Sequence, residues 1–134
     1  MRTVLAHGVF DLLHVGHLEH LRRARMLGDK LCVSVVPDKF IEKHIGRPIY
    51  NEVERLTLVG SLHCVDAVFL CDGPGPENVI RLVKPDLYVR GEDYAGKEMP
   101  ESALLREMGI PVVYTQSVPP RTGEIIERIL ARAR

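Results

Sequence analysis

Five short apolar runs alternate with segments of helical periodicity along this chain, and that alternation limits its possible folds more than any other feature. Each run is brief and almost continuously hydrophobic, as strands covered on both faces are. Such an alternation predicts a parallel sheet with right-handed helical crossovers, so we expect an α/β, doubly wound sheet of five strands. The expected strands are residues 3–7, 31–36, 67–70, 86–89 and 111–115. The expected helices are residues 16–27, 51–62, 76–83, 101–108 and 123–133.

Length and composition fit a single Rossmann-like domain over residues 1–134. The chain is 46% apolar, and its 18 basic residues balance 18 acidic ones, which argues against general binding to nucleic acid or anionic membranes. We find no apolar run of the ~20 residues that a spanning helix needs and no signal-peptide layout. Cys32, Cys64 and Cys71 fit neither a disulfide framework nor a Cys-x-x-Cys site, so we expect a reducing, cytoplasmic location.

Residues 8–17, which read Gly-Val-Phe-Asp-Leu-Leu-His-Val-Gly-His, place two imidazoles where a strand gives way to a helix. Gly16 lacks a Cβ, so a ligand can approach the backbone, and a helix start offers unpaired N–H groups that suit phosphate. We expect His14 and His17 to donate hydrogen bonds to nucleotide phosphates and to stabilise charge during phosphoryl transfer. The alternatives are capping or packing of the helix start, and metal ligation.

The other polar segments follow expected strands in the same way. In doubly wound sheets, ligands bind beyond the carboxyl ends of the strands. Residues 38–47, 91–94 and 117–122 follow the second, fourth and fifth expected strands, so they lie on the same rim as the two histidines. We expect His7 and His20 to be packing or surface residues.

The pattern Gly8-x-Phe10-Asp11-x-x-His14-x-Gly16-His17 resembles the signature of the cytidylyltransferase-like nucleotidyltransferases. That family includes glycerol-3-phosphate cytidylyltransferase, the adenylyltransferase domain of ADP-heptose synthase and archaeal-type FAD synthetase. The likeness continues through Gly28-Asp29, Gly46-Arg47-Pro48, Arg55, Val65-Asp66, Lys84-Pro85-Asp86 and Gly91-x-Asp93-Tyr94. The resemblance implies transfer of a nucleoside monophosphate from CTP or ATP to the phosphate of a small phosphorylated alcohol or sugar, with release of pyrophosphate.

The resemblance also implies which residues form the site. The implied catalytic residues are His14, His17, Lys43 and Arg55. The implied nucleotide-binding residues are Gly8, Val9, Phe10, Asp11, Gly16, Gly91, Asp93, Arg121 and Thr122. The implied acceptor-binding residues are Lys39, Arg47, Arg90 and Lys97. No protein side chain is expected to bind a metal directly, because Mg²⁺ would arrive with the nucleoside triphosphate.

Local chemistry offers second interpretations of several of these residues. Arg55 on a helix could pair with a carboxylate at the surface instead of binding phosphate. Asp11 is expected above all to hold its turn by accepting backbone N–H bonds. The segment from Lys39 to Arg47 could be a solvated loop, and in it Lys43 would substitute for a lysine that family members carry just before Gly-x-x-Arg-Pro.

The start of the last expected helix departs from the family pattern. Family members typically show Ser-Thr-Thr there, whereas this chain reads Arg121-Thr122-Gly123. Thr122 is expected to cap the helix, and Arg121 to meet the same phosphates through its planar guanidinium. The change leaves open a non-catalytic nucleotide-binding module. A redox dinucleotide binder would need a Gly-x-Gly-x-x-Gly turn, which the first crossover lacks.

Two branches of the family fit the chain. Residues 84–94 look most like the sugar-phosphate adenylyltransferases, whereas chain length and residues 8–17 look equally like glycerol-3-phosphate cytidylyltransferase. We put a glycerol-3-phosphate cytidylyltransferase-like enzyme first and a heptose-type or FAD-synthetase-like adenylyltransferase second. The nucleotide base, the acceptor and the effect of the altered helix start on activity stay open. The family likeness also implies a homodimer.

Overall fold

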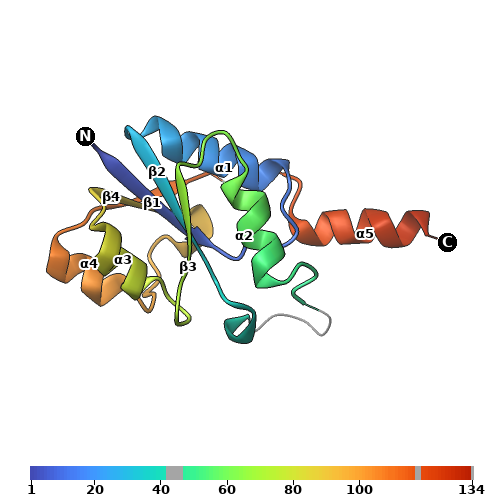
Figure 1. Ribbon diagram of the computed structural model, residues 1–134. Coiled ribbons are helices and arrows are strands. Elements are labelled where there is room, and N and C mark those ends of the chain that lie inside the picture. The colour runs from blue at the N-terminus through green and yellow to red at the C-terminus, as the bar shows by residue number, and fades with distance from the viewer. Residues whose placement is uncertain (42–46, 117–118, 134) are drawn as a thin grey trace.

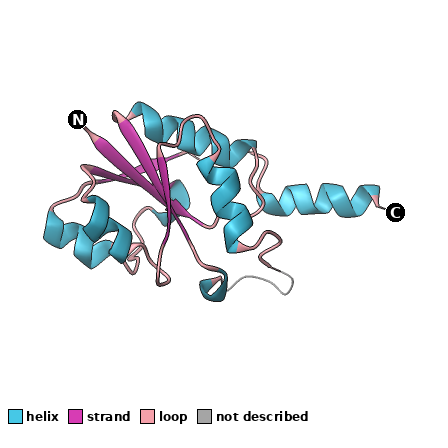
Figure 2. Ribbon diagram, viewed as in Figure 1, coloured by secondary structure: helices cyan, strands magenta, loops and turns pink. Residues whose placement is uncertain are grey.

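The structure, a computed structural model, describes residues 1–41, 47–116 and 119–133. Within these residues, five parallel strands form one sheet in the order β3-β2-β1-β4-β5, with helices on both faces (Figures 1 and 2). The strands are β1 (Thr3–Gly8), β2 (Lys30–Val35), β3 (Ala67–Leu70), β4 (Leu87–Gly91) and β5 (Val112–Thr115). The helices are α1 (Val15–Met26), α2 (Glu52–Gly60), α3 (Glu77–Val83), α4 (Ser102–Met108) and α5 (Thr122–Arg132), with short 3₁₀ turns η1 (Asp38–Phe40) and η2 (Glu92–Tyr94).

This architecture confirms the prediction of an α/β, doubly wound parallel sheet. Every strand and helix expected from the sequence is present, with its ends within about two residues of the expected ones. The chain runs outward from β1 to β3 on one side and then returns to place β4 and β5 on the other. The strand order therefore reverses between β1 and β4, where a doubly wound sheet binds its ligand.

Alternating side chains along each strand supply two separate cores. One face of the sheet packs against α1 and α2, and the other packs against α3 and α4 (Figure 1). The first core includes Val4, Ala6, Leu31, Val33, Val35, Leu87 and Val89, with Leu21 and Ala24 of α1 and Val59 of α2. The second includes Leu5, Cys32 and Tyr88, with Val79 and Ile80 of α3 and Leu104 and Leu105 of α4. Within the described residues, no helix is long and apolar enough to cross a bilayer.

The buried face of α2 differs from the one that hydrophobicity predicts. Hydrophobicity predicts a buried stripe of Val53, Leu56, Leu58, Val59 and Leu62. Val59 is fully buried and Leu56 and Leu62 pack against the core, but Val53 and Leu58 are exposed. Arg55 and Val59, which are one helical turn apart, are the buried residues of α2. Val53 and Leu58 therefore lie outside the buried face of the helix. A charged residue therefore occupies a core position.

We expect Gly28→Ala to destabilise the fold, since a Cβ there would lie 2.7 Å from the Arg2 carbonyl oxygen and 2.7 Å from the Val4 side chain. The Arg2 carbonyl is also held by the Asp29 N–H at 2.8 Å, so it cannot move away freely. The expected loss of unfolding free energy is about 1–3 kcal/mol, measured by urea denaturation. The control is Gly123→Ala in α5, where a Cβ meets nothing within 4 Å. It should keep or slightly raise stability, and equal losses in both variants would contradict the steric argument.

Candidate active site

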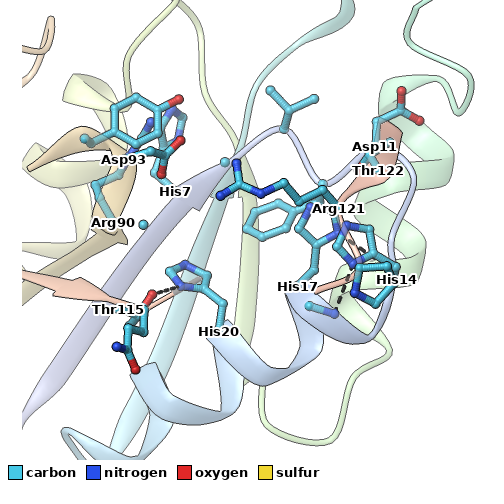
Figure 3. Close-up of a pocket in the computed structure, with 18 residues that line it drawn as sticks. His7, Asp11, His14, His17, His20, Arg90, Asp93, Thr115, Arg121 and Thr122 are labelled. Carbon is cyan, nitrogen blue, oxygen red and sulfur yellow. Dashed lines mark hydrogen bonds between the residues drawn. The ribbon is translucent and has the colours of Figure 1, made fainter. Parts of the chain in front are cut away.

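A cavity of about 340 Å³ opens at the carboxyl ends of β1, β4 and β5, between the starts of α1 and α5 (Figure 3). The structure thus brings together segments from opposite ends of the chain. The predicted site residues that line it are Gly8, Val9, Phe10, Asp11, His14, Gly16, His17, Arg90, Gly91, Asp93, Arg121 and Thr122. In the close-up, His14, His17 and Arg121 lie near the start of α1, whereas His7, Arg90 and Asp93 lie across the cavity.

His14 and His17 cap the start of α1 reciprocally. Nδ1 of His14 accepts from the Gly16 N–H at 3.0 Å, and Nδ1 of His17 accepts from the His14 N–H at 3.3 Å. The rings are stacked with centroids 3.9 Å apart. A nitrogen that accepts carries no proton, so each neutral ring carries its proton on Nε2. The capping interpretation and the chemical one are therefore compatible, because capping uses Nδ1 and leaves the Nε2–H as a donor.

Electrostatics favour the neutral form of His14. Burial lowers the pKa of His14 below its ordinary value, and the nearby carboxylate of Glu124 only partly opposes this. A protonated Nδ1 would also lose the bond from Gly16. Near neutral pH the helix start therefore presents hydrogen-bond donors to the cavity, which suits an anionic ligand.

Phe10 shapes the turn between β1 and α1. Its φ of 55° lies in the left-handed region, which a bulky residue rarely adopts. The ring is buried, packs edge-on against His17 with centroids 5.5 Å apart, and lies where a side chain on Gly8 would be, with ring atoms 3.0 Å from that Cβ position. Packing thus holds the strained turn, and Gly8 is required for the ring to fit.

Asp11 holds the turn, as predicted, but its partners come from a distant loop. The carboxylate accepts from the N–H groups of Ile49 and Tyr50 at 2.9 and 3.0 Å, and from Nε of Arg47 at 2.8 Å. Burial alone would raise the pKa of Asp11, but these donors outweigh it and hold the pKa below its ordinary value. Arg47 also donates to the Asp11 carbonyl at 2.6 Å. Arg47 therefore secures the loop, and the acceptor contact predicted for it stays a prediction.

Arg55 is fully buried beneath the rim, which neither interpretation from sequence anticipated. Its guanidinium donates to the carbonyls of Val9 and Val36 at 3.0 and 2.7 Å. It also donates to the Tyr50 carbonyl at 3.1 Å and to the Asp38 carboxylate at 2.7 Å. Arg55 is not among the residues that line the cavity, and its predicted contact with phosphate stays a prediction. The residue ties three loops together under the site.

Three other predicted cations lie away from this cavity or cannot be placed. Lys39 lies over the Phe40 ring, 5.1 Å from its centroid. Lys97 lines a separate pocket beside α4 and β5. Lys43 lies outside the described residues.

Arg90 and Asp93 form the opposite wall of the cavity, at the end of β4. The Arg90 guanidinium stacks on the Tyr94 ring, with Cζ 3.8 Å from the ring centroid. Arg90 also lines a second cavity of about 280 Å³, which has His7, Gly8, Val9 and Tyr94 in common with the first. The two cavities therefore meet at the ends of β1 and β4. A Cβ on Gly91 would lie 2.8 Å from the Asp93 carboxylate, so a side chain there would displace that carboxylate from its present position.

The sequence interpretation missed His7 and His20 as site residues. His20 lies one turn after His17 on α1 and hydrogen-bonds Thr115 at the end of β5 (Figure 3). His7 is buried and bonds the Ser34 hydroxyl at 2.8 Å. Both histidines line the cavity. His14, His17 and His20 follow one another at intervals of three residues. This spacing predicts that all three lie on one face of the helix.

The start of α5 corrects the expected cap. Arg121, not Thr122, is the N-cap residue, and it makes no side-chain capping bond. Its backbone carbonyl accepts from the N–H of Glu124 at 3.0 Å, which puts Thr122 inside the first turn. Both side chains still line the cavity. Arg121 therefore brings a guanidinium to the site where the family pattern has hydroxyls.

Comparison with known proteins gives a consistent picture. The model of the cytidylyltransferase-like family matches residues 5–115. Bifunctional protein HldE of Streptomyces coelicolor is 42% identical over 133 residues, covering 98% of this chain and 28% of that protein. HldE of Citrifermentans bemidjiense is 38% identical, covering 97% of this chain and 27% of the relative. The chain thus spans about a quarter of the length of these curated relatives.

Solved structures agree with the fold. The lipopolysaccharide core biosynthesis protein from Thermoplasma volcanium superimposes with a TM-score of 0.72 and 33% identity, covering 90% of this chain and 99% of that one. Pantothenate synthetase from Thermus thermophilus, at 20% identity and a TM-score of 0.62, shares the fold over 90% of this chain and 57% of its own.

We expect stability to fall as pH drops from 6.5 toward 4, in part through His20. Burial and the charge of Arg90 lower the pKa of His20 to about 4, with Asp93 opposing. The unfolded chain then binds a proton in this range that the folded chain does not, so acid favours unfolding by up to about 3 kcal/mol. Tm measured from pH 7.5 to 4 should change less steeply in His20→Gln than in the wild type. His63→Gln, at an exposed histidine, is the control, and identical slopes in all three proteins would refute the assignment.

Proposed function

The chain belongs to the cytidylyltransferase-like family, and from that membership and the site geometry we propose that it transfers a nucleotidyl group from a nucleoside triphosphate to the phosphate of a small sugar-type acceptor. The observation that carries the proposal is the pair of capping imidazoles, His14 and His17, which line a cavity that Arg121 also borders. The family match confirms the prediction of a nucleotidyltransferase-type domain. The substrates of this chain are the proposal.

In the proposed reaction, an oxygen of the acceptor phosphate attacks the α-phosphorus of the triphosphate. The bond from the α-phosphorus to the bridging oxygen breaks, and pyrophosphate leaves with the electron pair. His14, His17 and Arg121 would donate to the leaving oxygens, where negative charge builds up. The N–H groups at the start of α1 add to this stabilisation. No covalent enzyme intermediate is needed.

Mg²⁺ would enter as part of the nucleotide substrate and share the neutralisation of its phosphates. Among the residues that the structure describes, no three His, Cys, Asp or Glu side chains form a metal-binding group. Both oxygens of Asp11 already accept bonds from the loop at residues 47–50. Asp93 lines the cavity and suits a metal-bound water. In this proposal the triphosphate itself would hold most of the ion's coordination.

The second cavity is the proposed place of the acceptor. It lies beside the first, and Arg90 borders both, so a phosphate on Arg90 would lie next to the nucleotide. Its lining residues include the apolar Val36, Phe40, Ile41 and Met99, and its volume of about 280 Å³ fits a small molecule. These features support a compact phosphorylated acceptor.

The relatives favour a sugar-phosphate adenylyltransferase over the glycerol-3-phosphate cytidylyltransferase that sequence analysis put first. The matched curated proteins carry the name HldE, and the structural relative at 33% identity is named for lipopolysaccharide core biosynthesis. Residues 84–94 already resemble the sugar-phosphate branch. We therefore propose ATP and a heptose-type sugar phosphate. The FAD-synthetase-like and non-catalytic alternatives, the homodimer, the cytoplasmic location and the role of Lys43 stay predictions.

Pyrophosphate release tests this proposal directly. ATP and CTP are each paired with heptose 1-phosphate, glycerol 3-phosphate and FMN, and release is expected with ATP and the sugar phosphate. Release with CTP and glycerol 3-phosphate instead would restore the first sequence prediction. A non-catalytic module would gain Tm with nucleotide yet release pyrophosphate with none of the acceptors.

His14→Asn separates capping from chemistry. Asparagine is a strong N-cap, so its side-chain oxygen can replace Nδ1 and keep the helix start folded, but it has nothing at the position of Nε2. We expect kcat to fall about 10²–10³-fold, with Tm close to that of the wild type. Leu13→Met, a neutral change at the adjacent residue, is the control. Wild-type turnover by a folded His14→Asn protein would remove His14 from the mechanism.

A further inference from the structure

Three polar side chains form a buried cluster at the wall between the two cavities. They are Tyr88 and Arg90 of β4 and Glu101, which precedes α4, with exposed fractions of 0%, 7% and 1%. Tyr88 and Arg90 are two residues apart on one strand, so they face the same side of the sheet, the side that α4 covers. An apolar group would suffice for packing here, so the buried charges need an explanation.

One oxygen of Glu101 connects the cluster. Oε2 accepts from the Tyr88 hydroxyl and lies 3.7 Å from Nη1 of Arg90. Burial raises the pKa of Tyr88 far above its ordinary value, with the Glu101 charge adding to the rise, so the hydroxyl remains a donor. A buried carboxylate without such partners would cost several kcal/mol. The hydroxyl thus fixes the carboxylate, and the carboxylate faces the guanidinium.

The Tyr94 ring constrains Arg90 from another direction. With Cζ 3.8 Å from the ring centroid, the guanidinium lies between an aromatic face and a carboxylate. Among the described residues, Glu101 is the acidic partner that lies within ion-pair distance of Arg90. A guanidinium carries five N–H donors, more than its contacts with the Glu101 carboxylate and the Tyr88 hydroxyl can use. The residue is therefore oriented and still able to bind an anion in either cavity that it borders.

We propose that Glu101 is a positioning residue, which, fixed by the Tyr88 hydroxyl, holds the Arg90 guanidinium at the wall between the two cavities to receive the acceptor phosphate. The identity of that anion rests on the proposed function, whereas the orientation of Arg90 does not. An arginine held in place in advance loses less conformational freedom on binding. Glu101 also borders the second cavity, but its Oε2 is taken up by the Tyr88 hydroxyl and Arg90, so it should determine acceptor affinity through Arg90.

Side-chain NMR of the Arg90 Nε–Hε group tests the orientation without any substrate. Glu101→Gln keeps the size of the residue and an oxygen for Tyr88, but removes the charge. We expect a well-ordered Arg90 signal in the wild type, identified by its loss in Arg90→Lys, and a mobile or broadened one in Glu101→Gln. The matched control is Glu98→Gln, at an exposed carboxylate that pairs with Arg106 at 2.9 Å. An equally ordered Arg90 in Glu101→Gln overturns the proposal.

Kinetics then test the consequence for the acceptor. In Glu101→Gln the KM for heptose 1-phosphate should rise about tenfold, the scale of one charge-assisted hydrogen bond, while the KM for ATP stays within about twofold. In an Arg90→Lys background, Glu101→Gln should add little further change, because it acts through Arg90. Independent, multiplying effects of the two changes would overturn the proposal and leave Glu101 a structural residue.

Two further outcomes are distinguishable. If Glu101→Gln does not fold, Tyr88→Phe is the second variant, because it removes the hydroxyl that fixes the carboxylate. The Arg90 signal should then become mobile or broadened, as expected for Glu101→Gln. An unchanged Arg90 signal in Tyr88→Phe contradicts the proposed role of Glu101. If the wild type releases no pyrophosphate with any acceptor, the proposed function fails. The NMR comparison still decides whether Glu101 orients Arg90.

Discussion

The site depends on one buried cation, Arg55. Beyond the carboxyl ends of parallel strands, the carbonyl groups of the loops have no hydrogen-bond partner in the sheet. Where water is excluded, these carbonyls need a donor from elsewhere in the protein. The Arg55 guanidinium is that donor for loops that follow β1 and β2 and for the one that leads into α2. The carboxylate of Asp38 balances the charge. Removing the cation would leave several buried acceptors unpaired at once, so the rim keeps its shape only while Arg55 is in place.

At the start of α1, Nδ1 of each imidazole hydrogen-bonds the backbone. This bond fixes the orientation and the tautomer of each ring, so under the proposed function the rings would need no reorganisation before a ligand binds. Asp11 completes this support by joining the turn to the loop at residues 47–50. The same few side chains thus hold the fold and line the cavity, which explains why this segment carries so much of the sequence signal.

Apolar periodicity was sufficient to predict the strands, the helices and the rim, because burial on two faces of a parallel sheet leaves a strong local pattern. It failed at α2, where the inward residue is an arginine and hydrophobicity alone assigned Val53 and Leu58 to the core. The partners of Asp11 and of Glu101 were also beyond local reasoning. Those contacts join residues far apart in the chain or depend on side-chain direction, and a single sequence encodes neither explicitly. The histidine at position 20 was within reach, since helical spacing alone places it beside the other two.

Helix α5 projects from the body of the domain and contains no buried residue, yet its first turn borders the cavity (Figure 1). The start of α5 therefore contributes side chains to the cavity wall, whereas no described residue of α5 belongs to either core. Mutations in that turn can change one wall of the cavity with little effect on folding. Mutations at the start of α1 disturb both the cavity wall and the fold. Evolutionary drift in ligand preference should accordingly concentrate at this end of the chain, and Arg121, where relatives in the family carry hydroxyls, is an example of such a change.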